Sequence, residues 1–345
     1  MATALASRCK AAILGASSAR ADRKSNGTPM NYPQVEAPRN HAFPRTFCAA
    51  WGIRDAPYGG QGSRGLQDAM DHPLKLAIAG LAGRMGKQVA SSAIERGHIL
   101  TGGTEAPGSP ALQTDIGVLI GAPKPFNLLP QTEAHLAAAD AQAWIDFTAP
   151  AATLNALQRL ENTGVCALVI GTTGFDAQQT ETLSSYANRF AIVKAGNFSL
   201  GVTLMTALTR LAAARLGQGW DIEVLETHHR WKADAPSGTA LMLGEAAASG
   251  HGQALTDVQA APYLGPAAER TAGEIGFAVR RSGGVIGDHE VTFASETEVV
   301  SLSHAALNRS VFADGALAAA EWAIAQPPGL YDMHDVLGLK DLANV

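Results

Sequence analysis

The feature that most constrains the fold is a repeated alternation of short apolar runs and amphipathic stretches that begins at Leu74. "LKLAIAG" (74–80) has the composition of a buried strand, and "GRMGKQVASSAIERG" (83–97) follows it with helical spacing. Because strands that alternate with crossover helices build parallel sheets, the sequence predicts an α/β fold with a Rossmann-like, doubly wound parallel sheet. The later strands of this sheet are expected at "HILTGGTE" (98–105), "AWIDFT" (143–148), "VCALVIG" (165–171) and "FAIVKAG" (190–196).

A second domain is predicted beyond residue 198. A long helical stretch (199–217) precedes the strand "DIEVLETHH" (221–229), and several strand-like segments lie between Ile275 and Ser303. No helical pattern separates those segments, which is typical of a smaller α+β domain with a mixed sheet. The tail "FADGALAAAEWAIAQ" (312–326) is helical again, so a C-terminal helix is expected after the second sheet.

Composition narrows the class of protein. The 345 residues are 46% hydrophobic and 17% charged, with a net charge of -5, which indicates a globular chain of about two domains and argues against nucleic acid as a partner. No apolar run approaches the roughly 20 residues of a membrane span. Cys9, Cys48 and Cys166 form no CxxC pair or disulfide framework. A cytoplasmic protein with a small-molecule ligand is therefore expected.

Residues 1–73 differ from the rest, because they are rich in Arg, Ser, Gly and Pro and show no sustained periodicity. They are predicted to be a disordered extension. Two interpretations stay open. An organelle transit peptide would explain why the first twenty residues carry three basic side chains and no acid. A translated upstream region, with the working start at Met30 or Met70, is favoured because Met70 falls just before the first strand.

A glycine-rich loop follows the first strand. "AIAGLAGRMG" places Gly80, Gly83 and Gly86 at GxxGxxG spacing where a strand turns into a helix. Such a loop lets a pyrophosphate approach backbone N–H groups at a helix N-terminus. The spacing departs from the commoner GxGxxG, and a tight turn that needs glycine for packing alone is the alternative.

Glu105 lies nineteen residues beyond Gly86, at the end of the second strand. There a carboxylate can accept hydrogen bonds from the hydroxyls of an adenosine ribose, although taken alone it would be an exposed strand-end acid. The loop and the acid together predict a dinucleotide site. Ala106 offers no charge to a 2′-phosphate, which favours NADH, while Arg84 and Lys87 are the nearby cations that could bind one.

Two further loops are expected to meet the nicotinamide end of that dinucleotide. "GTTGF" (171–175) and "AGNFS" (195–199) each follow a predicted strand. Doubly wound sheets bind ligands at the carboxyl ends of their strands, so both loops are candidates. Alternatively, the residues of either loop could serve only to form a turn.

The segment "ETHHRWKADAPSGTA" (226–240) predicts a second site. Ser237 is a candidate N-cap of the helix that follows, and the N–H groups of Gly238 and Thr239 would then form an anion site suited to a carboxylate.

The same segment carries candidates for acid–base chemistry. Lys232 supplies a cation, and His228 has an imidazole that can donate a proton near neutral pH. A histidine that is merely hydrogen-bonded in the core is the alternative. No metal is expected, since His228 and His229 point to opposite faces of a strand and no ligand spacing surrounds them.

These motifs, together with "DFTAP" (146–150) and "LSHAALNRSVFADGALAAAEW" (302–322), closely resemble the 4-hydroxy-tetrahydrodipicolinate reductase (dihydrodipicolinate reductase) family. The resemblance runs from about Leu74 to the C-terminus. It implies NADH- or NADPH-dependent reduction of 4-hydroxy-tetrahydrodipicolinate, a cyclic dicarboxylate, to tetrahydrodipicolinate in lysine and diaminopimelate biosynthesis. It also implies a homotetramer. Because the family often has arginine after the ribose acid, Ala106 is a departure that favours NADH.

The resemblance also implies residue roles. His228 matches the general acid and Lys232 the second catalytic cation, while the substrate contacts are His229, Ser237, Gly238 and Thr239. The implied cofactor contacts are Gly80, Gly83, Arg84, Met85, Gly86, Glu105, Gly171, Thr172, Thr173, Ala195, Asn197 and Phe198.

The implied domains are a dinucleotide-binding domain (74–198), a substrate-binding and oligomerisation domain (199–308), and a C-terminal segment (309–345) that returns to the first domain. Two other functions stay open. One is a related nicotinamide enzyme, such as a homoserine or aspartate dehydrogenase. The other is a non-catalytic NAD(H) sensor, which would have no use for His228 and Lys232 beside an anion site.

Removal of residues 1–69 is expected to leave folding and activity intact, because this segment has no pattern able to bury a core. The measurement compares the activity and thermal midpoint of the truncated and full chains. An insoluble truncated protein, or one that loses most of its activity, would contradict the expectation.

Overall fold

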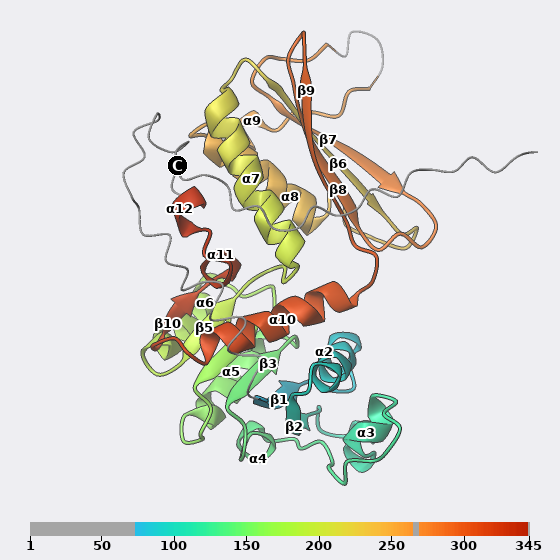
Figure 1. Cartoon of the computed structure of the whole chain (residues 1–345), viewed down its shortest axis with the longest axis vertical. Helices are drawn as coiled ribbons and strands as arrows, with labels where there is room; N and C mark the ends of the chain where they lie inside the picture. The colour runs from blue at the N-terminus through green and yellow to red at the C-terminus, as the bar shows by residue number, and fades with distance from the viewer. Residues whose placement is uncertain (1–72, 265–268, 344–345) are drawn as a thin grey trace, which may run out of the picture. The chain divides into compact units, whose positions relative to one another are not determined.

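The computed structural model describes residues 73–264 and 269–343. Apart from Pro73, the predicted N-terminal extension lies outside these residues, as do Cys9 and Cys48. The described residues form two separate sheets (Figure 1). No helix among them is long and apolar enough to cross a membrane.

The first sheet has six parallel strands in the order β10-β5-β4-β3-β1-β2. The order reverses between β1 and β3, which is the topological switch point where such sheets bind ligands. The predicted Rossmann-like class is therefore confirmed. The strands are β1 (Lys75–Ala79), β2 (Ile99–Thr104), β3 (Ala143–Asp146), β4 (Ala167–Ile170), β5 (Ala191–Lys194) and β10 (Gly329–Tyr331).

Helices cover both faces of this sheet because successive strand residues point to opposite sides. Leu76 and Ile78 of β1 join one core with helices α2, α10 and α11. Ala77 and Ala79 join the other core with α4, α5 and α6. The bounds are α2 (Arg84–Glu95), α4 (Ala134–Ala137), α5 (Pro150–Leu160), α6 (Ala177–Ser185), α10 (Ser310–Ala323) and α11 (Met333–Val336). Shorter elements are η3 (Pro110–Gln113), α3 (Ile116–Leu119), η4 (Tyr186–Asn188) and α12 (Lys340–Ala343).

The second sheet is mixed, with the order β7-β6-β8-β9. Strand β6 runs parallel to β7 and antiparallel to β8, which pairs with β9. Figure 1 shows α7 and α8 together on one side of this sheet. The elements are α7 (Leu200–Leu216), β6 (Asp221–His228), α8 (Gly238–Gly250), α9 (Leu255–Val258), β7 (Ile275–Arg281), β8 (Asp288–Ala294) and β9 (Val299–Ala305).

The face of β6 that packs against the helices is apolar at the start of the strand and carries titratable side chains at its end. Ile222 and Val224 enter the apolar core with α7 and α8. The next two residues on that face, Glu226 and His228, are also buried, with 1% and 7% of their surfaces exposed. Burial of charged or titratable groups is costly unless they are paired, so this end of β6 is a candidate functional site.

The C-terminal segment returns to the first sheet. Helix α10 packs in the core beside α2, and β10 pairs with β5. Gly315 of α10 lies so close to the backbone of Phe198 that a Cβ would stand 1.7 Å from the Phe198 carbonyl oxygen. The helix therefore fixes the loop that contains Asn197 and Phe198.

Gly315→Ala is expected to destabilise the protein although alanine favours helix by about 1 kcal/mol. The added methyl meets a backbone oxygen that no rotamer change can move, and overpacking costs about 1–3 kcal/mol. The contact with backbone places the cost at the upper end of that range, so the net loss is about 2 kcal/mol. A differential scanning measurement should show the thermal midpoint fall by about 4–8 °C.

Gly164→Ala is the matched control, because a Cβ there meets nothing closer than the Ala141 carbonyl oxygen at 3.8 Å. An unchanged midpoint in Gly315→Ala would show that α10 does not hold the loop.

Candidate active site

The glycine loop stands directly after β1. Gly80 has a φ of +62°, which favours glycine, and its carbonyl oxygen accepts the N–H of Gly83 at 2.9 Å. A Cβ on Gly86 would lie 2.2 Å from the same oxygen, so packing alone requires glycine there. Gly83 caps α2 without a side-chain hydrogen bond, and Gly83 and Arg84 are exposed. The loop thus packs tightly and leaves the start of α2 open to an anion.

Glu105 lies beside this loop. Its Oε1 accepts the backbone N–H of Ala82 at 2.5 Å, which joins the end of β2 to the turn after β1. The sequence spacing predicted this neighbourhood, because adjacent parallel strands end at the same edge of the sheet. Met85 is partly buried against the core of the first sheet, so its side chain serves packing.

The loops after β4 and β5 line a cavity of about 540 Å³. Thr172, Thr173 and Ala195 belong to this lining, together with Lys194 and residues of the β10–α11 segment. The Thr172 hydroxyl is already engaged, since it accepts the N–H of Thr148 at 3.0 Å. Gly171 lies where a Cβ would stand 2.1 Å from the Phe147 ring.

The loop after β5 also reaches the second sheet's helices. Asn197 Nδ2 donates to Thr239 Oγ1 on α8 at 3.0 Å. The Phe198 ring is buried and packs edge-on against Phe147. The structure therefore brings a candidate nicotinamide loop into contact with the helix predicted to bind the substrate.

A charged cluster surrounds His228 at the end of β6. Its Nδ1 contacts the Glu226 carboxylate, and Arg281 Nη1 donates to Glu226 Oε2 at 2.9 Å. Burial would raise the pKa of Glu226, but the hydrogen bonds from Arg281 and His228 outweigh it and lower that pKa below its ordinary value. The Glu226 side chain is therefore a carboxylate at neutral pH.

His289 of β8 lies next to His228, with a ring-centroid distance of 5.1 Å. Burial, and then the charge of His228, lower the pKa of His289 to about 4. His289 is thus neutral at pH 7, and its Nε2 lies 3.2 Å from Ser237 Oγ. One of the two neighbouring imidazoles is held neutral by its surroundings.

Ser237 is the N-cap of α8, as the sequence predicted. Its Oγ accepts the Ala240 N–H at 3.1 Å, while its own N–H donates to Glu226 Oε1. Gly238 begins the helix and is exposed. The cap and the His228 cluster are consequently one hydrogen-bonded unit.

Lys232 contacts a carboxylate supplied by its own loop. Its Nζ lies 2.9 Å from Asp234 Oδ1. The hydrogen bond from Lys232 lowers the pKa of Asp234 most, and the N–H of Gly238 lowers it further. Asp234 is thus the carboxylate paired with Lys232 just before α8.

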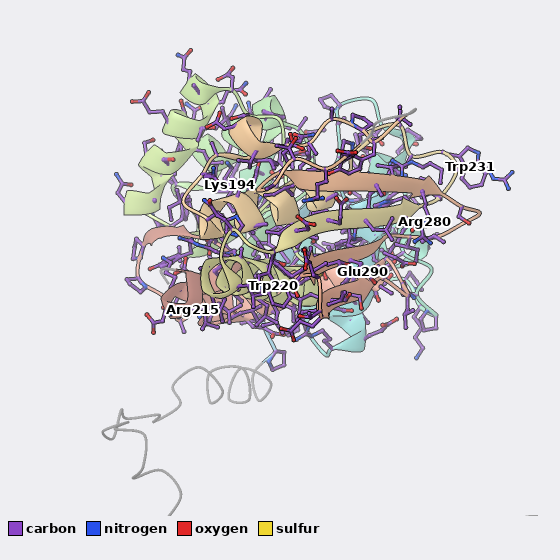
Figure 2. The ribbon with its side chains drawn as sticks, turned by 90° about the horizontal axis from the view of Figure 1, so that it is seen from above. Lys194, Arg215, Trp220, Trp231, Arg280 and Glu290 are labelled. Carbon is purple, nitrogen blue, oxygen red and sulfur yellow. The ribbon has the colours of Figure 1, made fainter. Side chains whose placement is uncertain are left out.

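His229 and Trp231 lie outside the buried cluster. His229 is half-buried, with its ring centroid 6.0 Å from that of Trp231. Figure 2 shows Trp231 projecting at the margin of the molecule, where 76% of its surface is exposed.

The sequence interpretation missed Glu226, Arg281, His289 and Asp234. Glu226 could have been found, because the two-residue period of a strand places it on the same face as His228. Arg281 and His289 come from other strands, and only the sheet register brings them to β6.

The arrangement can bind a carboxylate, donate a proton and hold a dinucleotide. No group of three or more His, Cys, Asp or Glu in residues 73–264 and 269–343 is arranged to bind a metal ion.

Comparison with known proteins agrees with this chemistry. Residues 74–198 match the family model "Dihydrodipicolinate reductase, N-terminus", a pyridine-nucleotide-binding domain, and residues 201–337 match "Dihydrodipicolinate reductase, C-terminus". A solved structure, dipicolinate-bound dihydrodipicolinate reductase from Paenisporosarcina sp. TG-14, shares the fold. Its TM-score is 0.61 at 24% identity, covering 76% of this chain and 98% of that one.

Relatives extend over most of the chain. The 4-hydroxy-tetrahydrodipicolinate reductase of Parvibaculum lavamentivorans is 49% identical over 79% of this chain and 100% of its own. The enzyme of the same name from Caulobacter vibrioides is 47% identical over 79% and 100%. The chain belongs to the dihydrodipicolinate reductase family.

Proposed function

We propose that the chain catalyses the nicotinamide-dependent reduction of 4-hydroxy-tetrahydrodipicolinate to tetrahydrodipicolinate in lysine and diaminopimelate biosynthesis. The observation that carries this proposal is the contact between Asn197 and Thr239. It joins a candidate nicotinamide loop to the helix whose first turn, with Lys232 and His228 nearby, suits a carboxylate-bearing substrate. A non-catalytic sensor would need neither His228 nor Lys232 beside the first turn of α8.

The dinucleotide is assigned to the glycine loop, to Glu105 and to the loops after β4 and β5. The loop suits the group because glycines leave the start of α2 accessible, and a Cβ at Gly86 would collide with Gly80. When bound, the reduced nicotinamide would supply a hydride to an unsaturated carbon of the cyclic imine. The 4-hydroxy group of the substrate leaves as water before or during turnover, which balances the conversion to tetrahydrodipicolinate.

His228 is assigned the proton transfer. Hydride addition leaves negative charge on the ring nitrogen, and His228, or a water that it orients, neutralises that charge. Lys232 stabilises the same charge and binds a substrate carboxylate with the N–H groups of Gly238 and Thr239. His229 and Ser237 complete the proposed substrate contacts.

The finer assignments belong to the same proposal. NADH is favoured over NADPH, since Glu105 suits free ribose hydroxyls and Ala106 is uncharged. A cytoplasmic homotetramer is proposed by analogy with the family. Exposed apolar side chains on the second sheet, including Val299 with 63% of its surface exposed, support assembly of the subunits through this sheet. The domain bounds remain 74–198, 199–308 and 309–345.

His228→Gln is expected to lower kcat about 10²–10⁴-fold, because a general acid acts only as the hydride arrives. Lys232→Ala should also lower kcat and raise KM through the lost carboxylate contact. Thr239→Ala should cost less, since alanine keeps the backbone N–H. The Kd for NADH should barely change in the His228 and Lys232 variants, because other residues hold the cofactor.

The matched control is His98→Gln. His98 is also buried beside a glutamate, with its Nε2 2.8 Å from Glu321, but it stands just before β2 of the first sheet. Steady-state kinetics and cofactor titration decide the matter. A near-normal kcat in His228→Gln would contradict the role of His228 and would indicate that bulk water supplies the proton.

The ratio of kcat/KM for NADH to that for NADPH is expected to exceed one. A second phosphate charge near Glu105 is repelled, and Ala106 offers no compensation. Parallel absorbance assays with both cofactors measure the ratio, and Glu105→Ala should weaken NADH more than NADPH. A hundredfold preference for NADPH, or about 2.7 kcal/mol, would show that Arg84, Lys87 or another cation dominates.

A further inference from the structure

Both oxygens of the Glu226 carboxylate accept hydrogen bonds from other groups of the protein. Its Oε1 accepts from Ser237 N–H and from Arg281 Nη2, both at 3.1 Å. Its Oε2 accepts from Arg281 Nη1 at 2.9 Å and also contacts His228 Nδ1. With 1% of its side chain exposed, this carboxylate faces the protein and not a ligand.

This contact fixes the tautomer of His228. A carboxylate can only accept, so Nδ1 of the neighbouring imidazole must carry a proton. In the neutral ring, Nε2 then has a free lone pair. Within the part of the chain that the structure describes, Nε2 has no hydrogen-bond partner, and Gly287 lies against it, where a Cβ would come within 3.0 Å. Nε2 is therefore the nitrogen that takes up a proton to form the imidazolium. The Nε2–H of that imidazolium is the group that would donate, while the Nδ1 proton stays hydrogen-bonded to Glu226.

Arg281 holds the same cluster from β7. Besides Glu226, it donates from Nη2 to the Asp234 carbonyl oxygen at 2.6 Å and from Nε to the Lys232 carbonyl oxygen at 3.3 Å. One guanidinium thus fixes the carboxylate behind His228 and the backbone of the loop that carries Lys232.

We propose that Glu226 and Arg281 are positioning residues that hold His228 in the Nδ1–H tautomer and direct Nε2 to the reacting nitrogen. The inference rests on the proposed role of His228 as proton donor. The remaining titratable neighbours do not replace Glu226, because His289 on β8 is neutral and Lys232 is cationic. Glu226 is the carboxylate that contacts Nδ1 of His228.

Glu226→Gln tests this directly. The amide nitrogen of glutamine must replace one carboxylate oxygen, and every partner of that carboxylate is a donor. Among these partners, only His228 can become an acceptor, by moving its proton to Nε2. The substitution should therefore invert the neutral tautomer while it preserves the volume of the side chain.

The chain supplies a matched control in a second Arg–Glu–His cluster. Glu321 is buried and contacts Arg96 and His98, as Glu226 contacts Arg281 and His228. His98 has the opposite tautomer, because its Nδ1 accepts the Leu74 N–H at 3.3 Å. Glu321→Gln therefore removes an equivalent buried charge far from the reacting groups, and His98 provides the reference signal for an Nε2–H ring.

The experiment records ¹⁵N spectra of [¹⁵N]histidine-labelled full chain at alkaline pH, with His228→Gln and His98→Gln to assign the two rings. We expect Nδ1–H for His228 in the unmodified chain and Nε2–H in Glu226→Gln. The kcat of Glu226→Gln should fall about 10- to 10³-fold, less than the roughly 10⁴-fold that a wrong tautomer costs in serine proteases. KM and the Kd for NADH should change little, and Glu321→Gln should keep its kcat.

Two results would overturn the proposal. One is an Nε2–H ring at His228 in the unmodified chain, which can be read whether or not the variant folds. The other is an unchanged tautomer in a folded Glu226→Gln. If the tautomer inverts in Glu226→Gln but kcat does not fall, Glu226 does set the tautomer of His228. That result would instead refute the proposed role of His228 as proton donor.

Discussion

The site depends on the burial of one carboxylate. Glu226 stands where β6 passes out of the apolar core formed by Ile222 and Val224, and an unpaired charge there would cost several kcal/mol. Arg281 offsets that cost with two hydrogen bonds, and the Ser237 N–H adds a third. Because these donors come from β7 and from the start of α8, pairing the charge also orders the strand end and the helix cap. Stability of this region and orientation of the imidazole are thus consequences of the same contacts.

The two sheets hold different parts of the proposed site for a geometric reason. In the first, all strands are parallel, so the loops after β1, β2, β4 and β5 gather at one edge. In the second, β6 ends beside α8, whose first turn presents N–H groups. The hydrogen bond from Asn197 to Thr239 joins the two sets. Under the proposed function, a hydride source held by one sheet and an acid held by the other would act on a single small molecule.

The sequence alone was sufficient to predict the elements with a periodic pattern and the motifs formed by residues close together in the chain. Strand β1 and its glycine loop, the spacing to Glu105 and the Ser237 cap all follow from neighbouring residues, and the Rossmann-like class was predicted correctly. The roles of the site residues stay predictions. Arg281 could not be assigned, because it lies 55 residues from Glu226 and only the parallel register of β6 and β7 pairs them. Asp234 was passed over for a related reason: its contact with Lys232 depends on how the loop folds back before α8.

The contact between Lys232 and Asp234 bears on the energetics of substrate binding. Under the proposed function, a substrate carboxylate that reaches Lys232 meets a cation already paired with the Asp234 carboxylate. Binding is then an exchange of one carboxylate for another, in which the cation stays paired throughout. Asp234 has 58% of its side chain exposed, so the displaced group can return to water at small desolvation cost. Arg281 holds the Asp234 backbone through its carbonyl oxygen, which leaves the side chain free to move while the loop stays fixed. The same loop can therefore keep Lys232 in place before the substrate arrives and release it to the substrate without rearrangement of the backbone.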